Sequence, residues 1–173
     1  MSSTYITHAI VLKNIPAGEA DAFVVLYTRD FGKLRAFAQG VKKESAKLRG
    51  HVEPLSLSWV QFVIGASGER LTYAHMMQSW PCIRNDFERY GAAHYLLELV
   101  DRHCLAGERD NTIWELLVGN LAFIERCDAA QIREGTELFE RDFLRILGYG
   151  DAKSISVLGS QLARPSAMVY NAI

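Results

Sequence analysis

The spacing of apolar residues changes once along this chain, at Pro81, and that change limits the folds the chain can adopt. Before Pro81, β-branched and aromatic residues gather in short runs that favour strands. After Pro81, apolar residues recur every three or four positions, which favours helices. The pattern predicts an α+β protein with a strand-rich domain over residues 1–80 and a helical domain over residues 81–150.

Five short runs before Pro81 have the composition of strands. Turn-forming residues separate them, among them Gly18, Gly32, which suits a positive φ, and a hairpin turn at Gly65–Gly68. Because five strands this short cannot cover both faces of an open sheet, we expect them to close into a barrel of the OB-fold type. The expected strands are residues 5–12, 22–28, 33–38, 56–64 and 71–77.

Three amphipathic helices are expected after Pro81, with short connections, as in a bundle that buries its own core. Their expected N-terminal caps are, in order, Asp86, Asp110 or Asn111, and Asp128. Gln131 resembles the second member of a capping box with Asp128, and Gly148 is the expected helix stop. The expected inner face of the first helix is Phe87, Tyr90, Ala93, Leu97, Val100 and Cys104. Residues 151–173 lack a clear period, so we expect an irregular C-terminal tail.

Positive charge is concentrated in the first part of a chain whose formal net charge is −1. Residues 1–80 hold nine Lys/Arg against six Asp/Glu, whereas residues 81–173 hold ten against fourteen. Residues 29–49 hold seven Lys/Arg against two acidic residues, most densely between Gly40 and Gly50. Several cations on a flexible loop can contact successive phosphates of a nucleic-acid strand and release counterions. We therefore expect this segment to bind nucleic acid; the alternative is a solvated surface turn.

The residues expected to contact nucleic acid combine basic side chains with one aromatic ring. They are Lys33, Arg35, Phe37, Lys42, Lys43, Lys47 and Arg49. The period of two in residues 33–38 points Phe37 outward, which makes it the best candidate to stack on a base. The inward side of the same strand is Leu34, Ala36 and Ala38. Tyr27 and Trp59 are weaker stacking candidates, since aromatic residues more often belong to a core.

No pattern in the sequence indicates a metal site, a cofactor site or a catalytic group. Cys82, Cys104 and Cys127 are odd in number and far apart, so we expect free thiols in a reducing compartment. His94 and Glu98 could share a metal ion, but an exposed or core-edge pair is the expected arrangement. GxGxxG, Walker and GxSxG motifs do not occur. We therefore expect no enzymatic activity and no cofactor.

The location expected for this chain is the cytoplasm, in association with the nucleoid. The N-terminus lacks a basic stretch followed by an apolar segment, as a signal peptide would have. No apolar run approaches the ~18 residues that a membrane-spanning helix needs. The cytoplasmic location follows by elimination.

The segment from Gly32 to Pro54, GKLRAFAQGVKKESAKLRGHVEP, resembles the signature of the RecO family of recombination mediators. That signature has Gly-Lys before the third strand, a small-x-Gly turn and two basic residues. A Ser and a Lys/Arg-Leu step then precede a second Gly and a Pro. Four other segments resemble the family in the same order: Tyr5–Lys13, Gly18–Asp21, Tyr95–Asp101 and Leu144–Tyr149. The resemblance covers about residues 5–150.

The resemblance implies an N-terminal OB-fold and a helical domain. It also implies binding to single- and double-stranded DNA, strand annealing, and recombinase loading on DNA coated by single-strand-binding protein. The implied partners are RecR and the acidic tail of single-strand-binding protein, the tail being bound by the helical domain. Many members carry a four-cysteine zinc site after the segment that Leu144–Tyr149 resembles, and this chain has none there. It therefore resembles a short form of the family without the zinc-binding cysteines.

The leading hypothesis is a DNA-binding recombination mediator. The main alternative is a protein-interaction module that docks RecR or single-strand-binding protein without strong DNA affinity of its own. An RNA-binding OB-fold protein is a weaker alternative, and an enzyme of any class comes last.

Overall fold

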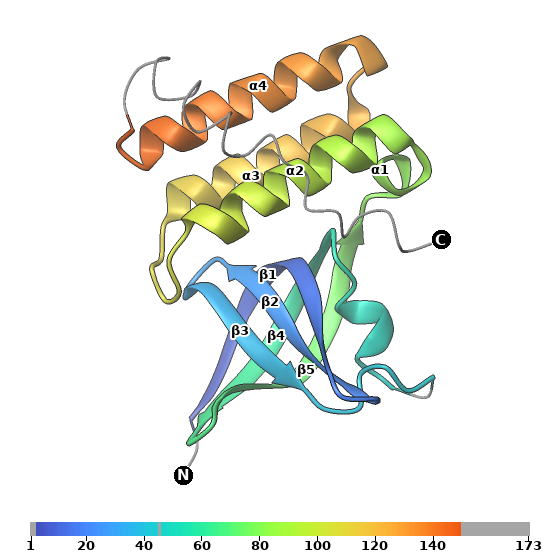
Figure 1. The fold of residues 1–173 in the computed structure, drawn as a ribbon, viewed down its shortest axis with the longest axis vertical. Helices are drawn as coiled ribbons and strands as arrows, with labels where there is room; N and C mark the ends of the chain where they lie inside the picture. Colours follow the sequence, from blue (N-terminus) through green and yellow to red (C-terminus); the bar gives the residue numbers. More distant parts are fainter. Residues whose placement is uncertain (1–2, 45, 150–173) are drawn as a thin grey trace.

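A computed structural model describes residues 3–44 and 46–149 of the chain. Five strands form a closed barrel in the order β1-β2-β3-β5-β4, and a layer of helices lies over one end of it (Figure 1). The strands are β1 (Thr4–Ala17), β2 (Asp21–Thr28), β3 (Gly32–Ala38), β4 (Ser56–Gly65) and β5 (Gly68–Ser79). The helices are the 3-10 helix η1 (Arg49–His51), α1 (Pro81–Asn85), α2 (Phe87–His103), α3 (Asn111–Arg126) and α4 (Ala129–Ile146). This arrangement confirms the α+β class and the five-stranded OB-type barrel.

The alternation predicted for the third strand is confirmed in β3. Its inward residues are buried: Leu34, Ala36 and Ala38. Arg35 is exposed and Phe37 is partly exposed on the outer side. β3 closes the barrel by a parallel pairing with β5, in which Phe37 stands opposite Arg70.

Two glycines form turns in the barrel as the sequence predicts. Gly65 pairs with Gly68 across a two-residue hairpin, and Gly68 has a φ of +101°. Gly32, after the β2–β3 turn, has a φ of +65°. A Cβ atom on Gly32 would lie 2.0 Å from the backbone oxygen of Glu108, in the loop that follows α2. Gly32 therefore permits both the turn and the close approach of the helical layer.

Strand β1 is longer than predicted, because it continues through Pro16 to Ala17. Pro16 pairs with Ala22 close to the end of the strand, where a missing N–H is tolerated. The register of β1 shifts between Val11 and Lys13. Such a bulge bends a strand, and here β1 pairs with β4 in its first half and with β2 along most of its length.

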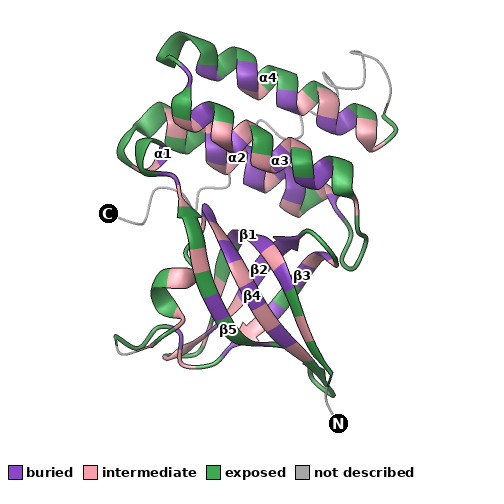
Figure 2. Ribbon diagram, turned by 180° about the vertical axis from the view of Figure 1, so that it is seen from behind, coloured by how far each residue is buried: buried purple, intermediate pink, exposed green. Residues whose placement is uncertain are grey.

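Two apolar cores share strand β2. Val24 and Leu26 point into the barrel, whereas Val25 and Tyr27 belong to the core between the barrel and the helices. This explains why β2 is apolar on both sides, and Figure 2 shows buried residues on the helices as well as on the strands. Tyr27 is completely buried and its hydroxyl donates to the backbone oxygen of Asp110 at 3.4 Å. The prediction of Tyr27 as a stacking residue is therefore wrong.

The predicted helix ends are confirmed. The carboxylate of Asp86 accepts a backbone N–H in the first turn of α2, and that of Asp110 accepts two in the first turn of α3. The Gln131 side chain accepts the N–H of Asp128 at 3.1 Å, as in a capping box. Gly148 follows α4 with a φ of +83°. The predicted tail, residues 151–173, lies outside the described residues.

The predicted inner face of α2 is wrong in its first turn, where Phe87 is 84% exposed and Tyr90 is 37% exposed. The buried residues of this region are instead Ala93, Leu96, Leu97, Leu99, Val100 and Cys104. Helix α2 packs against β1 and against the other three α-helices, so more than one of its faces is covered. In the first turn, the guanidinium of Arg89 donates to the backbone oxygens of Ile124 and Cys127, whereas Phe87 and Tyr90 remain exposed. Of the three free thiols, Cys104 and Cys127 are buried and Cys82 is exposed.

Candidate nucleic-acid interface

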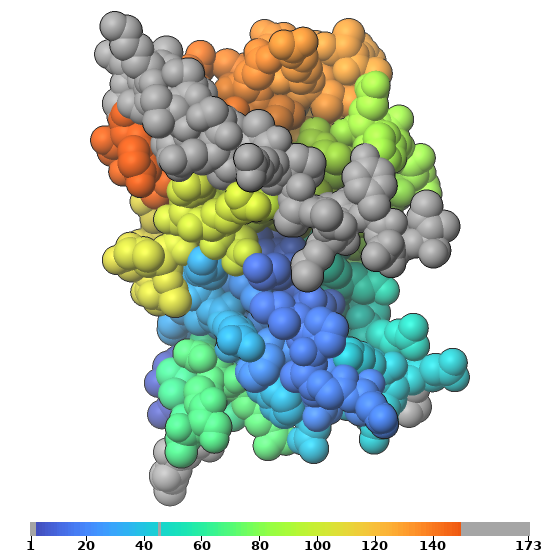
Figure 3. Space-filling view, viewed as in Figure 1, coloured from blue at the N-terminus to red at the C-terminus, as the bar shows by residue number. Residues whose placement is uncertain are grey.

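The segment between β3 and β4, residues 39–55, carries the densest group of cations, and we call it the basic loop. It passes through η1 before β4 begins. In Figure 1 the part of the loop before η1 lies at the lower end of the barrel, away from the helices. In the space-filling view the loop protrudes beside the β1–β2 end of the barrel (Figure 3).

The backbone of the basic loop is held against the barrel. The N–H of Gly40 donates to the carboxylate of Asp21 at 2.6 Å, and the N–H of Lys42 donates to a carbonyl of the β1–β2 turn at 2.9 Å. Val41 and Val52 are buried in the barrel core. The sequence predicts a flexible loop, but these two hydrogen bonds and the two buried valines anchor the loop that carries the cations to the barrel.

Four predicted phosphate contacts, Lys42, Lys43, Lys47 and Arg49, are exposed on the basic loop. Within residues 3–44 and 46–149, none of the four forms an ion pair with a carboxylate. The ammonium of Lys42 donates to the carbonyl of Gly18 at 2.7 Å, which draws the loop toward the β1–β2 turn. The positive charge of the loop is therefore open to an external anion.

A cavity of about 260 Å³ lies between the basic loop and strands β1 and β2. Lys42 and Arg49 both line it, together with Glu53. The Glu53 carboxylate lies 3.7 Å from a guanidinium nitrogen of Arg84, which offsets its charge. An anionic group in this hollow would meet two cations from different parts of the loop.

The outer side of β2 and β3 carries an aromatic pair and a cation. Phe23 stands opposite Phe37 in the strand register, with ring centroids 5.5 Å apart at 63°. The guanidinium of Arg35 lies 3.9 Å from the centroid of the Phe23 ring. Both aromatic rings are partly exposed. An arginine held on an aromatic face keeps its donors available for phosphate, and an exposed ring offers a surface for a base.

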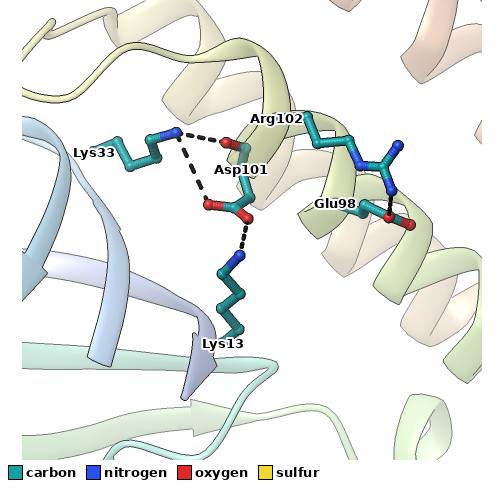
Figure 4. A network of polar contacts seen from close by, with 5 residues as sticks. All are labelled: Lys13, Lys33, Glu98, Asp101 and Arg102. Carbon is teal, nitrogen blue, oxygen red and sulfur yellow. Dashed lines mark hydrogen bonds and ion pairs between the residues drawn. The ribbon is translucent and has the colours of Figure 1, made fainter. Parts of the chain in front are cut away.

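Lys33 is separated from the other predicted residues and lies where the barrel meets α2 (Figure 4). Its ammonium donates to the backbone oxygen of Asp101 and lies 3.9 Å from the Asp101 carboxylate. Lys13 pairs with the same carboxylate at 2.5 Å. The side chains of Lys33 and Asp101 are each 18% exposed. The charge of Lys33 is thus matched by an acid of the protein itself.

Two further residues of this surface, Phe23 and Arg70, were not predicted. Arg70 stands opposite Phe37 in the β3–β5 pairing and donates to the side chain of Gln39 at 3.0 Å. Arg70 lies outside the basic segment 29–49, and a parallel pairing between distant strands leaves no trace in local spacing. The alternating pattern of β2 could have placed Phe23 outward, because Val24 and Leu26 face the barrel core.

Several titratable groups are buried where the barrel meets the helices. Burial raises the pKa of the Cys104 thiol to about 11 and also raises the pKa of the neighbouring Tyr27 phenol. Burial lowers the pKa of His103, and the charges of Arg102 and Lys33 add to this effect. These groups are neutral near pH 7, so they suit a packed contact between the barrel and the helices better than a charged ligand site.

His94 and Glu98, the pair considered for a metal ion, have other interactions in the structure. Glu98 forms an ion pair with Arg102 one turn along α2 (Figure 4). Burial lowers the pKa of His94, with Arg84 as a second cause. Among the residues that the structure describes, no group of three or more His, Cys, Asp or Glu side chains is arranged to hold a metal ion. In the same part of the chain, no helix has the length and apolar character needed to cross a membrane.

Comparison with protein-family models gives two matches that follow each other along the chain. The N-terminal model of recombination protein O matches residues 1–80, and the C-terminal model of the same protein matches residues 84–152. The chain belongs to the RecO family. The first match contains the barrel with the basic loop, and the second contains helices α2 to α4.

Curated relatives of the RecO family agree with this assignment. The DNA repair protein RecO of Geobacter metallireducens is 33% identical over 144 residues, which cover 83% of this chain and 58% of that protein. The protein of the same name from Gloeothece citriformis is 34% identical over 73% of this chain and 44% of its own length. That of Synechococcus elongatus is 38% identical over 72% and 47%. The chain spans about half the length of these relatives.

Proposed function

We propose that this RecO-family chain acts in DNA repair and recombination by holding DNA through its phosphates. The observation that carries the proposal is the set of cations on the basic loop. Lys42, Lys43, Lys47 and Arg49 are exposed and have no acidic partner among the described residues. Their charge therefore remains available to a polyanion, although the whole chain is close to neutral.

The barrel beside the loop supports the proposal. Its five strands contain two acidic residues, Asp21 and Glu69, and the Asp21 carboxylate already accepts the N–H of Gly40. Arg35 and Phe37 add a cation and a ring on the β2–β3 side. Phosphate contacts carry no base information, so the proposed binding covers single- and double-stranded DNA of any sequence.

Strand annealing and recombinase loading are the finer part of the proposal. A surface that neutralises the phosphates of two strands lowers their mutual repulsion, which favours pairing of complementary strands. RecR and the acidic tail of single-strand-binding protein are the proposed protein partners, with the tail on the helical domain. This role makes and breaks no covalent bond, and it places the protein at the nucleoid in the cytoplasm.

The test is fluorescence anisotropy with labelled single-stranded and duplex DNA. The double variant Lys42→Glu/Lys43→Glu should bind both at least about tenfold more weakly, equally for different base sequences. The matched control is Arg126→Glu/Arg133→Glu, which changes the net charge equally at exposed positions of α3 and α4. It should change affinity by less than about threefold.

Equal losses in the two double variants would contradict a local site, because net charge alone would then explain binding. A wild-type chain that binds no oligonucleotide but shifts in gel filtration with RecR would favour the protein-interaction module. Detectable preference for RNA over DNA in direct competition would favour the RNA-binding alternative.

A further inference from the structure

A second aromatic pair lies on the outer wall of the barrel formed by β4 and β5, and it includes Trp59, the weaker stacking candidate from the sequence. Trp59 and Tyr73 meet edge to face with ring centroids 5.6 Å apart. Tyr73 is 47% exposed and Trp59 is partly exposed. Met77, further along β5, is 54% exposed. This pair matches the Phe23–Phe37 pair in separation, and both present ring surface to solvent.

The end of the basic loop is fixed to this same wall. The imidazole Nδ1 of His51, in η1, accepts the N–H of Met76 at 3.2 Å, and its carbonyl accepts the hydroxyl of Ser58 at 2.6 Å. The rings of His51 and His75 are 5.6 Å apart, and His75 stands opposite Trp59 in the strand register. The path from the loop to the aromatic pair is therefore continuous.

The charge of the wall suits a polyanion. Glu69, beside the hairpin, is the one acidic residue in the two strands, both of which the structure describes completely. Arg70 lies on β5, opposite Phe37 of β3 on one side and Val63 of β4 on the other. A wall with exposed rings, imidazoles and a guanidinium, and almost without carboxylates, has the composition of a single-strand binding surface.

We infer that the β4–β5 wall is a second stacking site, where bases of single-stranded DNA pack on Trp59 and Tyr73 after the strand leaves Arg49 and His51. The inference deepens the proposed function and rests on it. The basic loop contacts phosphates of any DNA, whereas the wall contacts bases that only a single strand exposes. The wall therefore gives the protein its preference between single strand and duplex.

Intrinsic fluorescence tests this inference directly, because the chain has three tryptophans that differ in exposure. Trp80 is 1% exposed and Trp114 is 6% exposed, so Trp59 is the one that a ligand can reach. Titration with an oligonucleotide of about 15 thymidines should quench the tryptophan emission, since that length can span a barrel of this type. In Trp59→Phe the quenching should disappear while most of the affinity remains, because phenylalanine keeps a ring for stacking.

Affinity measurements complete the test. Tyr73→Ala should weaken binding of the thymidine oligonucleotide at least about fivefold and leave duplex affinity unchanged. The matched control is Phe87→Ala, which removes an exposed ring from α2 and should change neither. Circular dichroism of each variant confirms that the fold is kept.

The outcomes separate the inference from the proposed function. In one outcome, single-stranded DNA binds and Lys42→Glu/Lys43→Glu weakens this binding. The tryptophan emission is nevertheless unchanged, and Tyr73→Ala binds single strands like the wild type. The wall then does not contact bases, while the phosphate site stands. Quenching by a protein partner but not by the oligonucleotide would assign the wall to protein docking and overturn the inference. A wild-type chain that binds no DNA overturns both.

Discussion

Lysines occur both where the barrel meets the helices and on the basic loop, but they have opposite roles in the two regions. At the contact, Lys13 and Lys33 converge on Asp101, and Lys33 is largely buried. On the loop, Lys42 and Lys43 are exposed, and no acid among the described residues pairs with them. The first group holds the barrel and the helices together, and we propose that the second holds DNA. The difference shows that a distant acid, rather than local sequence, decides whether a basic residue is free for a ligand.

The largest expected effect concerns the close approach at Gly32. In Gly32→Ala the new Cβ would overlap the backbone oxygen of Glu108, and the positive φ would be strained as well. We expect a loss of at least ~3 kcal/mol in the free energy of unfolding, measured by urea titration. Gly18 is the control, because its φ is also positive (+86°) but no atom lies within 4 Å of a Cβ there. Gly18→Ala should cost only about 1–2 kcal/mol, and equal losses would show that packing at Gly32 contributes nothing.

The next effect concerns the acid that the two interface lysines share. Asp101→Ala leaves Lys33 without a carboxylate at a poorly exposed position, so we expect a loss of about 1–3 kcal/mol in the free energy of unfolding. Glu98→Ala is the control on the same helix, since it breaks an exposed pair with Arg102 and should cost only about 0.3–0.5 kcal/mol. DNA affinity should stay within about twofold of wild type in both variants. A large rise in affinity for Asp101→Ala would mean that Lys33 can also serve as a phosphate contact.

The smallest effect is a pH dependence that arises from α2. Folding lowers the pKa values of His94 and His103, so the unfolded chain binds more protons than the folded chain below about pH 6.5. The contribution of the two neutral histidines to the free energy of unfolding is fully present above this pH and should be lost as the pH decreases through 6. The double variant His94→Gln/His103→Gln should show a flatter dependence of Tm between pH 7 and 5.5, measured by circular dichroism. An unchanged slope would assign the acid sensitivity to other groups.

Much of the fold is predictable from the sequence because it follows from local patterns. The alternation of β3, the hairpin at Gly65–Gly68 and the cap at Asp128 each depend on residues close together in the chain. Errors arise where tertiary contacts decide burial. Phe87 fits a helix face by spacing but is 84% exposed, and Tyr27 is covered by helices that a strand pattern does not reveal.

The candidate site also has a part that the sequence predicts and a part that it does not. Charge density alone locates the basic loop, because its cations are neighbours in sequence. The engagement of Lys33 by Asp101 joins residues 68 positions apart, and no local pattern predicts it. Trp59 is a weaker stacking candidate from the sequence, but its pairing with Tyr73 on one outer wall follows only when β4 and β5 pair.

The salt dependence of single-strand binding tests the difference between the two lysine groups most directly. If four loop cations contact phosphates, the slope of log affinity against log salt concentration should be about −3 for the wild type. Lys42→Gln/Lys43→Gln should bring it to about −1.5, whereas Lys33→Gln should leave it at about −3. A slope unchanged by the loop variant, or one reduced by Lys33→Gln, would contradict the account.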